Sequence, residues 1–188
     1  GADLVIGSAG DDLVLGGDGN DTALLGAGDD TFVWNPGDDN DVIEGQAGTD
    51  TMLFNGANAS ENIDITADGG RVVFFRDIAN VVMDLNDTEV IDFNAPGGSD
   101  TVVVHDLAGT DAEEVRIDLA GTLGGTAGDG LADTVVVDGT NGDDAVTLSM
   151  DGDTLFVDGL ASRIVIEHFD AHLDRLQFRG FAGDDVID

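Results

Sequence analysis

A nine-residue repeat runs through the first third of this chain and constrains its fold more than any other feature. Full copies cover residues 7–15, 16–24, 25–33, 36–44 and 45–53, and residues 1–6 form the end of an earlier copy. The pair Trp34-Asn35 is the only insertion between copies. A unit this short cannot bury its apolar residues alone, so we expect successive copies to stack into a coiled β structure.

Each copy combines a glycine-rich turn, an aspartate at its sixth position and a short apolar strand. The sixth-position aspartates are Asp3, Asp12, Asp21, Asp30, Asp41 and Asp50. Glycine adopts positive φ angles without steric cost, which lets the first half of each copy turn tightly. The residue at the eighth position should point inward, because side chains alternate along a strand. These inward residues are Val5, Val14, Ala23, Phe32, Ile43 and Met52.

Stacking of the copies would place like charges above one another. If one copy forms half a coil, the sixth-position aspartates of alternate copies form two columns. The columns are Asp3, Asp21 and Asp41 on one side and Asp12, Asp30 and Asp50 on the other. Carboxylates about 5 Å apart repel by about 3 kcal/mol at an effective dielectric of about 20. Residues 1–56 contain 12 acids and no base, so the neutralising cation must come from solution.

Calcium suits such a turn better than magnesium or zinc. Calcium takes about 6–8 oxygen ligands, including carboxylates and backbone carbonyls, whereas magnesium requires stricter octahedral geometry and zinc prefers nitrogen and sulfur. The chain has no cysteine and 3 histidines. We therefore expect charge repulsion to unfold residues 1–56 without calcium, and calcium binding to fold them.

Residues 1–56 resemble the RTX (repeats-in-toxin, haemolysin-type) calcium-binding repeat proteins, which fold as parallel β-rolls. The resemblance implies that the six aspartates named above are calcium ligands. It also implies carbonyl and turn roles for Gly10, Gly17, Gly19, Gly26, Gly28, Gly37 and Gly48. The sequence departs from the family pattern at Leu25 and Pro36 (first position), Ser8 and Gln46 (second position) and Asp39 (fourth position).

After residue 56 the repeat dissolves, but short β-rich segments continue. They cover residues 63–66, 71–75, 80–85, 89–93, 100–107, 114–119, 133–139, 144–150, 153–159 and 162–169. Both a β-sandwich and a β-helix accommodate such strands, and we favour the β-helix. The predicted fold is all-β, a right-handed parallel β-roll or β-helix solenoid. Its parts are the nonapeptide β-roll (1–56), an irregular β-helix-like continuation (57–179) and the start of a further repeat (180–188), where Asp185 is a candidate calcium ligand.

Several other polar and apolar residues have a functional and a structural interpretation. Turn capping is favoured over calcium binding at Asp100, Asp133, Asp144 and Asp174. His168 and His172 have the spacing of a helical metal site, but their segment reads as a strand, so surface histidines are favoured. The outward apolar residues at the ninth positions are Ile6, Leu15, Leu24, Val33 and Leu53. For them, cover by neighbouring segments is favoured over a lateral contact face.

The charge of the whole chain limits its partners. With 40 acids, 6 arginines and no lysine, the formal net charge is −34, which disfavours binding to nucleic acids and anionic membranes. The sequence has no membrane-spanning apolar run and no catalytic motif, and we predict no enzymatic activity. It begins at Gly1 without a signal-peptide pattern, and we interpret it as a mature fragment or an excised segment.

The hypothesis that follows is a calcium-binding structural module of a secreted bacterial RTX-like protein. It would fold on calcium binding outside the cell, as part of an adhesin, a surface layer or a filament. Self-association or contact with neighbouring modules of a longer chain would be its macromolecular interactions. The alternative is the non-catalytic repeat region of a secreted enzyme, such as a lipase, protease or alginate epimerase.

Overall fold

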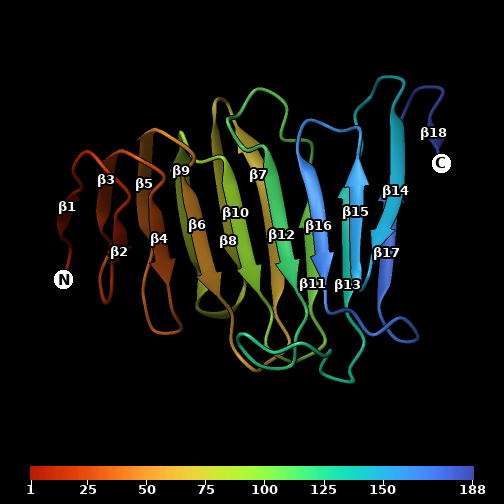
Figure 1. Ribbon diagram of the computed structural model, residues 1–188, viewed down its shortest axis with the longest axis horizontal. Helices are drawn as coiled ribbons and strands as arrows, with labels where there is room; N and C mark the ends of the chain where they lie inside the picture. Colours follow the sequence, from red (N-terminus) through yellow and green to blue (C-terminus); the bar gives the residue numbers. More distant parts are fainter.

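The computed structural model describes residues 1–188 as two nine-stranded β-sheets (Figure 1). Sheet A has the strand order β1-β3-β5-β9-β8-β7-β11-β13-β17, and sheet B the order β2-β4-β6-β10-β12-β16-β15-β14-β18. The only helical element is a 3₁₀ turn at Ile78–Asn80. No helix has the length and apolar character needed to cross a membrane. The predicted all-β class is confirmed.

The strands are short, and every β-rich segment predicted from the sequence contains one. Sheet A contains Leu4–Ile6 (β1), Thr22–Ala27 (β3), Asp41–Ala47 (β5), Val81–Asn86 (β9), Arg71–Arg76 (β8), Asn62–Asp68 (β7), Thr101–Val104 (β11), Thr134–Asp138 (β13) and Arg175–Arg179 (β17). Sheet B contains Leu13–Leu15 (β2), Thr31–Trp34 (β4), Thr51–Asn55 (β6), Val90–Asn94 (β10), Glu114–Asp118 (β12), Arg163–Glu167 (β16), Thr154–Asp158 (β15), Ala145–Asp151 (β14) and Val186–Ile187 (β18). Strand β17 had no counterpart in the sequence-based expectation.

The N-terminal strands β1 to β6 alternate between the two sheets, one strand for each nine-residue copy. All pairings among them are parallel, and their register aligns each repeat with the next but one. The eighth-position side chains point between the sheets as predicted. Ala23, Phe32, Ile43 and Met52 are fully buried, Val14 is buried and Val5 is partly buried at the open end. Apolar burial at this position therefore helps to hold the coils together.

Two antiparallel meanders interrupt the parallel arrangement beyond the repeats. In sheet A, two strands, β9 and β8, lie between β5 and β7. The chain therefore reaches β7 first and then runs back through β8 and β9 towards β5. In sheet B, β14, β15 and β16 repeat this arrangement. The expectation of an entirely parallel continuation was wrong at β8 and β15. The physical reason is a two-residue hairpin turn in each meander, at Gly69-Gly70 and Gly152-Asp153, with φ of 65° at Gly69 and 61° at Gly152.

An aromatic cluster fills the core where the repeats meet the first meander. The ring of Trp34 stacks on that of Phe54 with a centroid distance of 4.0 Å and an interplanar angle of 4°. Phe54 also contacts Phe74 and Phe93, at 4.5 and 6.0 Å between ring centroids. Trp34 belongs to the two-residue insertion in the repeat, and its indole N–H donates to the carbonyl of Asp39 at 2.9 Å. The insertion thus supplies the largest side chain of the core.

Candidate metal centre

The sixth-position aspartates form two ladders along the edges of the roll, as the repeat spacing predicts. The backbone N–H of Asp3 donates to Oδ1 of Asp21 at 2.7 Å, and the N–H of Asp21 donates to Oδ1 of Asp41 at 2.9 Å. The residues in these pairs are 18 and 20 positions apart, the difference being the Trp34-Asn35 insertion. The second ladder joins Asp12 to Asp30 at 2.7 Å and Asp30 to Asp50 at 2.9 Å.

In four of the six repeat aspartates, the second carboxylate oxygen is buried without any hydrogen-bond partner. These orphaned Oδ2 atoms belong to Asp21, Asp30, Asp41, Asp50 and, outside the repeats, Asp100. All five residues are between 0 and 2% exposed. An ionised oxygen that has lost its water and gained no donor is strongly destabilising. A hard cation such as calcium is the group that satisfies it.

Other ladder carboxylates have a protein partner for this second oxygen. Oδ2 of Asp12 accepts hydrogen bonds from the backbone N–H of Ser8 at 2.8 Å and from its hydroxyl at 3.2 Å. Oδ2 of Asp174 accepts the N–H of Asp170 at 2.6 Å, and Oδ2 of Asp144 that of Thr140 at 2.8 Å. Asp12 therefore differs from the four orphaned repeat aspartates. Asp144 and Asp174 cap their own turns, as predicted.

The two remaining aspartates predicted as turn caps behave differently. Oδ1 of Asp100 accepts the N–H of Glu61 at 2.8 Å, and Oδ1 of Asp133 accepts the N–H of Asp100 at 2.7 Å. Neither carboxylate accepts a hydrogen bond from its own turn, so the expectation of turn capping was wrong for both. They instead continue the sheet A ladder, because β11 and β13 stack as the coils of the repeats do.

The repeat glycines permit both the turn and the close stacking of coils. All seven glycines predicted for the turns have positive φ angles, from 74° at Gly17 to 146° at Gly48. A Cβ atom on Gly28 would lie 2.5 Å from the carbonyl carbon of Gly10 in the preceding coil. A Cβ on the first-position Gly16 would lie 3.3 Å from Oδ2 of both Asp21 and Asp41. Glycine there keeps space open between two orphaned oxygens.

Burial makes several ladder carboxylates hard to ionise without a cation. Desolvation, opposed in part by a backbone hydrogen bond, raises the pKa of Asp41 and of Asp50 to about 6. The same cause raises the pKa of Asp133 to about 6 and that of Asp100 to about 7. Neighbouring acids of each ladder add to the shift of the pKa. Near neutral pH, these sites favour any cation that stabilises the ionised form.

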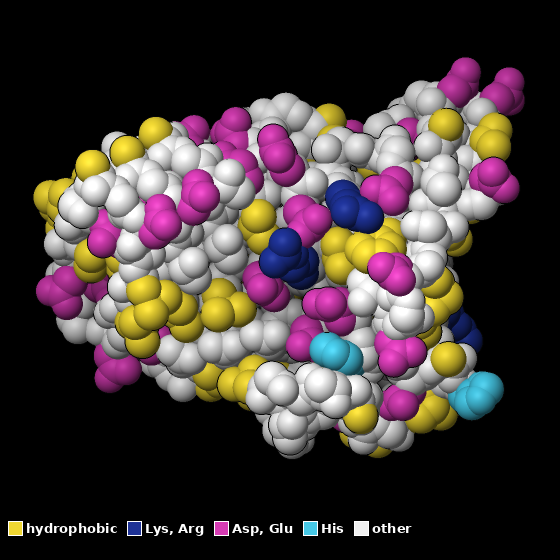
Figure 2. Space-filling model, viewed as in Figure 1, with side chains coloured by type: hydrophobic (Ala, Val, Ile, Leu, Met, Phe, Trp, Pro, Cys, Tyr) yellow, Lys and Arg dark blue, Asp and Glu magenta, His cyan; other side chains and the backbone are white.

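Beyond the repeats, arginines and histidines of the chain itself neutralise acids. Glu61 stands at the ladder position before β7 and is fully buried, and the guanidinium of Arg76, 3% exposed, pairs with it. Arg71 also pairs with one acid of the repeats, Glu44 in the fourth copy, at 2.8 Å on the outer surface. The face drawn in Figure 2 shows dark blue arginines among magenta acids at its centre, and acids without a base over the N-terminal coils.

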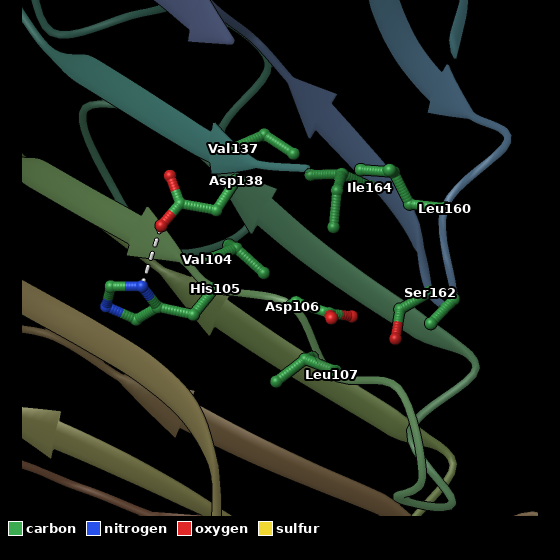
Figure 3. A pocket seen from close by; sticks show the side chains of 10 residues that line it. Val104, His105, Asp106, Leu107, Val137, Asp138, Leu160, Ser162 and Ile164 are labelled. Carbon is green, nitrogen blue, oxygen red and sulfur yellow. Dashed lines mark hydrogen bonds and ion pairs between the residues drawn. The ribbon is translucent and has the colours of Figure 1, made fainter. Parts of the chain in front are cut away.

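A small pocket beside β11 contains a histidine and a serine but no nucleophilic arrangement (Figure 3). The ring nitrogens of His105 lie 2.8 Å from Oδ2 of Asp138 and 3.0 Å from Oδ2 of Asp64. Ser162 points away from His105 and donates to the carbonyl of Ala112 at 2.5 Å. The space of about 10 Å³ suffices for roughly one water molecule.

No three side chains of His, Cys, Asp or Glu converge as a metal site. His168 pairs with Asp118 at 2.7 Å, and His172 is exposed. A cation at the ladder turns would therefore take its other ligands from backbone carbonyls, as the glycine-rich turns suggest. Two of the predicted ligands lie at the open ends of the roll. Asp3 is exposed, and so is Asp185, whose Oδ1 accepts the N–H of Asp144 at 3.1 Å.

Comparisons with known proteins agree with this geometry in the first third of the chain. Residues 1–32 and 37–58 match the RTX calcium-binding nonapeptide repeat, in four copies. No curated protein sequence matches the chain. Among solved structures, the fold is similar to that of the extracellular lipase LipA from Serratia marcescens, with a TM-score of 0.40 and 15% sequence identity. The similarity covers 92% of this chain and 38% of the lipase chain.

Proposed function

From the RTX calcium-binding repeats that this chain carries, we propose that its N-terminal coils bind calcium at their buried turn carboxylates and fold on doing so. The RTX nonapeptide repeat binds calcium and is a structural, non-catalytic unit. The observation that carries the proposal is the set of orphaned oxygens on Asp21, Asp30, Asp41 and Asp50. These four residues are the proposed principal carboxylate ligands.

The remaining predicted ligands complete the proposed sites. The turn carbonyls of Gly10, Gly17, Gly19, Gly26, Gly28, Gly37 and Gly48 provide neutral oxygen ligands. Asp3, Asp12 and Asp185 belong to the same ladders and remain proposed ligands, although they lack the orphaned oxygen of the other four. Calcium supplies positive charge that residues 1–56 do not contain. The chain in turn supplies oxygens that are already dehydrated and held in place.

The free energy of calcium binding suffices to decide whether the coils fold. A ligand that binds only the folded state stabilises it by about 1.4 kcal/mol per site at tenfold excess over its Kd. Four such sites give about 5–6 kcal/mol, comparable to the net stability of a small domain. The proposed module is therefore unfolded at low calcium and folded at high calcium.

This calcium dependence suits a structural module of a secreted bacterial protein, such as an adhesin, a surface layer or a filament. Export in the unfolded state followed by folding outside the cell is the proposed sequence of events. The proposed coil is right-handed, the hand of nearly all parallel strand crossovers. The proposed parts remain residues 1–56, 57–179 and 180–188. A catalytic domain encoded beside this segment would instead assign the module to a secreted enzyme.

Hydrogen exchange measured by mass spectrometry in calcium and in EDTA tests the proposal on the whole chain. We expect amides of β1 to β6 to lose protection in EDTA, because the ladder charges are then unneutralised. Amides of β8 serve as the internal reference, since both neighbours of this strand belong to the meander and Arg76 neutralises Glu61 there without calcium. Equal protection of β1 to β6 in both buffers would overturn the proposal.

A further inference from the structure

Nine of the ladder carboxylates fall into two groups according to the residue four positions before them; Asp133 and Asp185 belong to neither group. In Asp12, Glu61, Asp144 and Asp174, the backbone N–H of that residue donates to the second carboxylate oxygen. The donors are Ser8, Ala57, Thr140 and Asp170, at 2.8, 3.1, 2.8 and 2.6 Å respectively. In the orphaned group this hydrogen bond is missing in every case.

The local backbone explains why the hydrogen bond is missing within the repeats. The residues four positions before Asp21, Asp30, Asp41 and Asp50 all have positive φ angles. They are Gly17 (74°), Gly26 (114°), Gly37 (117°) and Gln46 (79°). A positive φ turns the peptide plane away from the direction that it has in the capped turns. The orphaned oxygen is therefore a consequence of the turn conformation that the repeat imposes.

Asp100 also lacks this hydrogen bond, but for a different reason. The residue four positions before it is Pro96, which has no N–H to donate. No other protein group replaces that donor, because Oδ2 of Asp100 is buried and unpartnered. Asp100 lies 42 residues beyond the last residue that matches the repeat, so this site is not part of the matched copies.

The turn around Asp100 otherwise has the geometry of a repeat turn. Gly98 has a φ of 130°, within the range of 128° to 146° at the fourth-position glycines Gly10, Gly19, Gly28 and Gly48. A Cβ on Gly98 would lie 2.5 Å from the carbonyl carbon of Ala59, so the two turns stack as closely as those in the repeats. The ladder contacts of Asp100 with Glu61 and Asp133 match those of Asp21 with Asp3 and Asp41.

The charges around Asp100 leave its second oxygen without a counter-ion. The acids that act on it are Asp133, Glu61 and Asp129. Glu61 is paired with Arg76, and Oδ2 of Asp129 accepts the N–H of Gly98 at 2.8 Å. No arginine or histidine forms an ion pair with Asp100 or Asp133.

We propose that Asp100 ligates a further calcium ion, at the turn between Pro96 and Thr101 and next to Asp133. The site goes beyond the calcium sites of the repeats, because it lies in the part of the chain where the repeat is no longer present. Asp133, in the adjacent coil, would provide the second carboxylate of the site. The proposed ion therefore links β11 to β13. Calcium dependence thus extends into the coils beyond the first meander.

Calorimetric calcium titration of the whole chain at pH 7.5 tests the site with Asp100→Asn. The amide has the same shape, accepts the hydrogen bond from Glu61 N–H and lacks the charge. We expect one calcium ion fewer per chain and a smaller rise of Tm on adding calcium. In EDTA the variant should be at least as stable as the wild type, because an uncompensated charge is gone. An unchanged stoichiometry and affinity would overturn the proposal.

Asp174→Asn is the matched control, since Asp174 belongs to the same ladder. Both oxygens of Asp174 accept backbone N–H groups, from Asp133 at 2.9 Å and from Asp170 at 2.6 Å. This variant should bind as many calcium ions as the wild type. Loss of an ion in both variants would contradict the proposal, because the effect would not follow the orphaned oxygen.

Two further variants separate this site from the sites of the repeats. Asp30→Asn should also remove one ion, and if Asp30→Asn alone does so, the Asp100 site fails while the proposed function stands. If neither Asp100→Asn nor Asp30→Asn changes the stoichiometry, the proposed function fails as well.

Pro96→Ala restores an N–H at the capping position and should weaken binding of one ion several-fold. Unchanged affinity in Pro96→Ala would contradict the role assigned to the missing N–H.

Discussion

Asp50 and Glu61 stand at the starts of consecutive strands, and the chain neutralises them in different ways. Both are fully buried, and both belong to a ladder in which backbone N–H groups bind carboxylates of the next coil. Glu61 receives the guanidinium of Arg76 from the first meander, whereas Oδ2 of Asp50 receives nothing from the protein. A cation carried on the chain makes the fold independent of solution conditions. A cation taken from solution makes it responsive to them.

The same contrast holds between the two regions as wholes. Residues 1–56 contain 12 acids and no base, and all 6 arginines and 3 histidines lie beyond them. Several of these bases bridge strands on the outer surface, as Arg179 and His105 do by sharing Asp138. The first meander lies at the boundary, because Arg76 also packs 5.3 Å from the ring centroid of Trp34. It provides a calcium-independent surface on which the last repeat coil can pack.

The largest expected effect comes from removing the cation that the chain carries. Arg76→Ala leaves Glu61 buried and unpaired, which should lower the free energy of unfolding by about 3–5 kcal/mol even in calcium. Urea denaturation measures it. Arg116→Ala is the control, since Arg116 and Glu114 form an exposed pair and their loss should cost under about 1 kcal/mol. Equal effects of the two variants would remove the distinction between the regions.

The pH dependence of the calcium-free protein should be the next largest effect, because several groups act together. The pKa values of Asp41, Asp50, Asp100 and Asp133 are raised from 3.8 to about 6 or 7, so the folded state binds protons that the unfolded state releases. The contribution of these four carboxyl groups to the free energy of unfolding is complete below pH 3.8. It is lost as the pH rises through 6 to 7. The pKa of His105, raised by its two carboxylate partners against desolvation, acts in the same direction.

We therefore expect the urea midpoint in EDTA to rise when pH is lowered from about 7.5 to about 5.5. In saturating calcium the trend should weaken or reverse, since protons then compete with the metal for the same oxygens. A midpoint in EDTA that falls with acidification would show that the ladder carboxylates are already stabilised as anions without a cation.

A single ladder charge in the repeats should have a smaller effect. Asp30→Asn removes one calcium site, which costs about 1.4 kcal/mol at tenfold calcium excess. Without calcium the same change removes repulsion and should stabilise β2 and β4, so the sign of the effect reverses on adding EDTA. Urea denaturation in calcium and hydrogen exchange of the β2 and β4 amides in EDTA measure this reversal. A loss of stability of equal size in both buffers would indicate packing instead of charge.

The smallest expected effect is in the first hairpin turn, far from any ladder. Gly69→Ala places a side chain at a φ of 65°, where nothing lies within 4 Å of the new Cβ, so only backbone strain contributes. We expect a loss of about 1 kcal/mol in both buffers. Gly69→Asn, which tolerates this conformation better, should recover part of it. A calcium-dependent effect of Gly69→Ala would contradict the independence of the meander.

The sequence was informative where a contact depends on spacing alone. The ladder partners of Asp21 and Asp30, the inward direction of Phe32 and Ile43, and most strands beyond residue 56 were predicted correctly. The meanders were missed even though Gly69-Gly70 and Gly152-Asp153 are hairpin signals. The parallel repeat before them made a parallel continuation the more natural expectation.

Charge pairing beyond the repeats was not predictable in the same way. The Arg76–Glu61 pair forms because β8 runs back antiparallel along β7. No fixed spacing between the two residues in the sequence predicts this ion pair. Asp100 and Asp144 follow similar glycine-containing turns, yet one is orphaned and the other capped. The difference lies four residues earlier, at Pro96 and Thr140, and it became visible only when both turns were compared as structures.

Residue spacing and charge were enough to establish a coiled β-fold, two acidic ladders and the need for an external cation over residues 1–56. These properties follow from short-period geometry and Coulomb repulsion, which act identically in every copy. The choice of neutralising group at each buried acid depended on the tertiary structure. That choice requires a donor or a guanidinium within about 3 Å of one oxygen, and only the path of the whole chain determines which groups approach that closely.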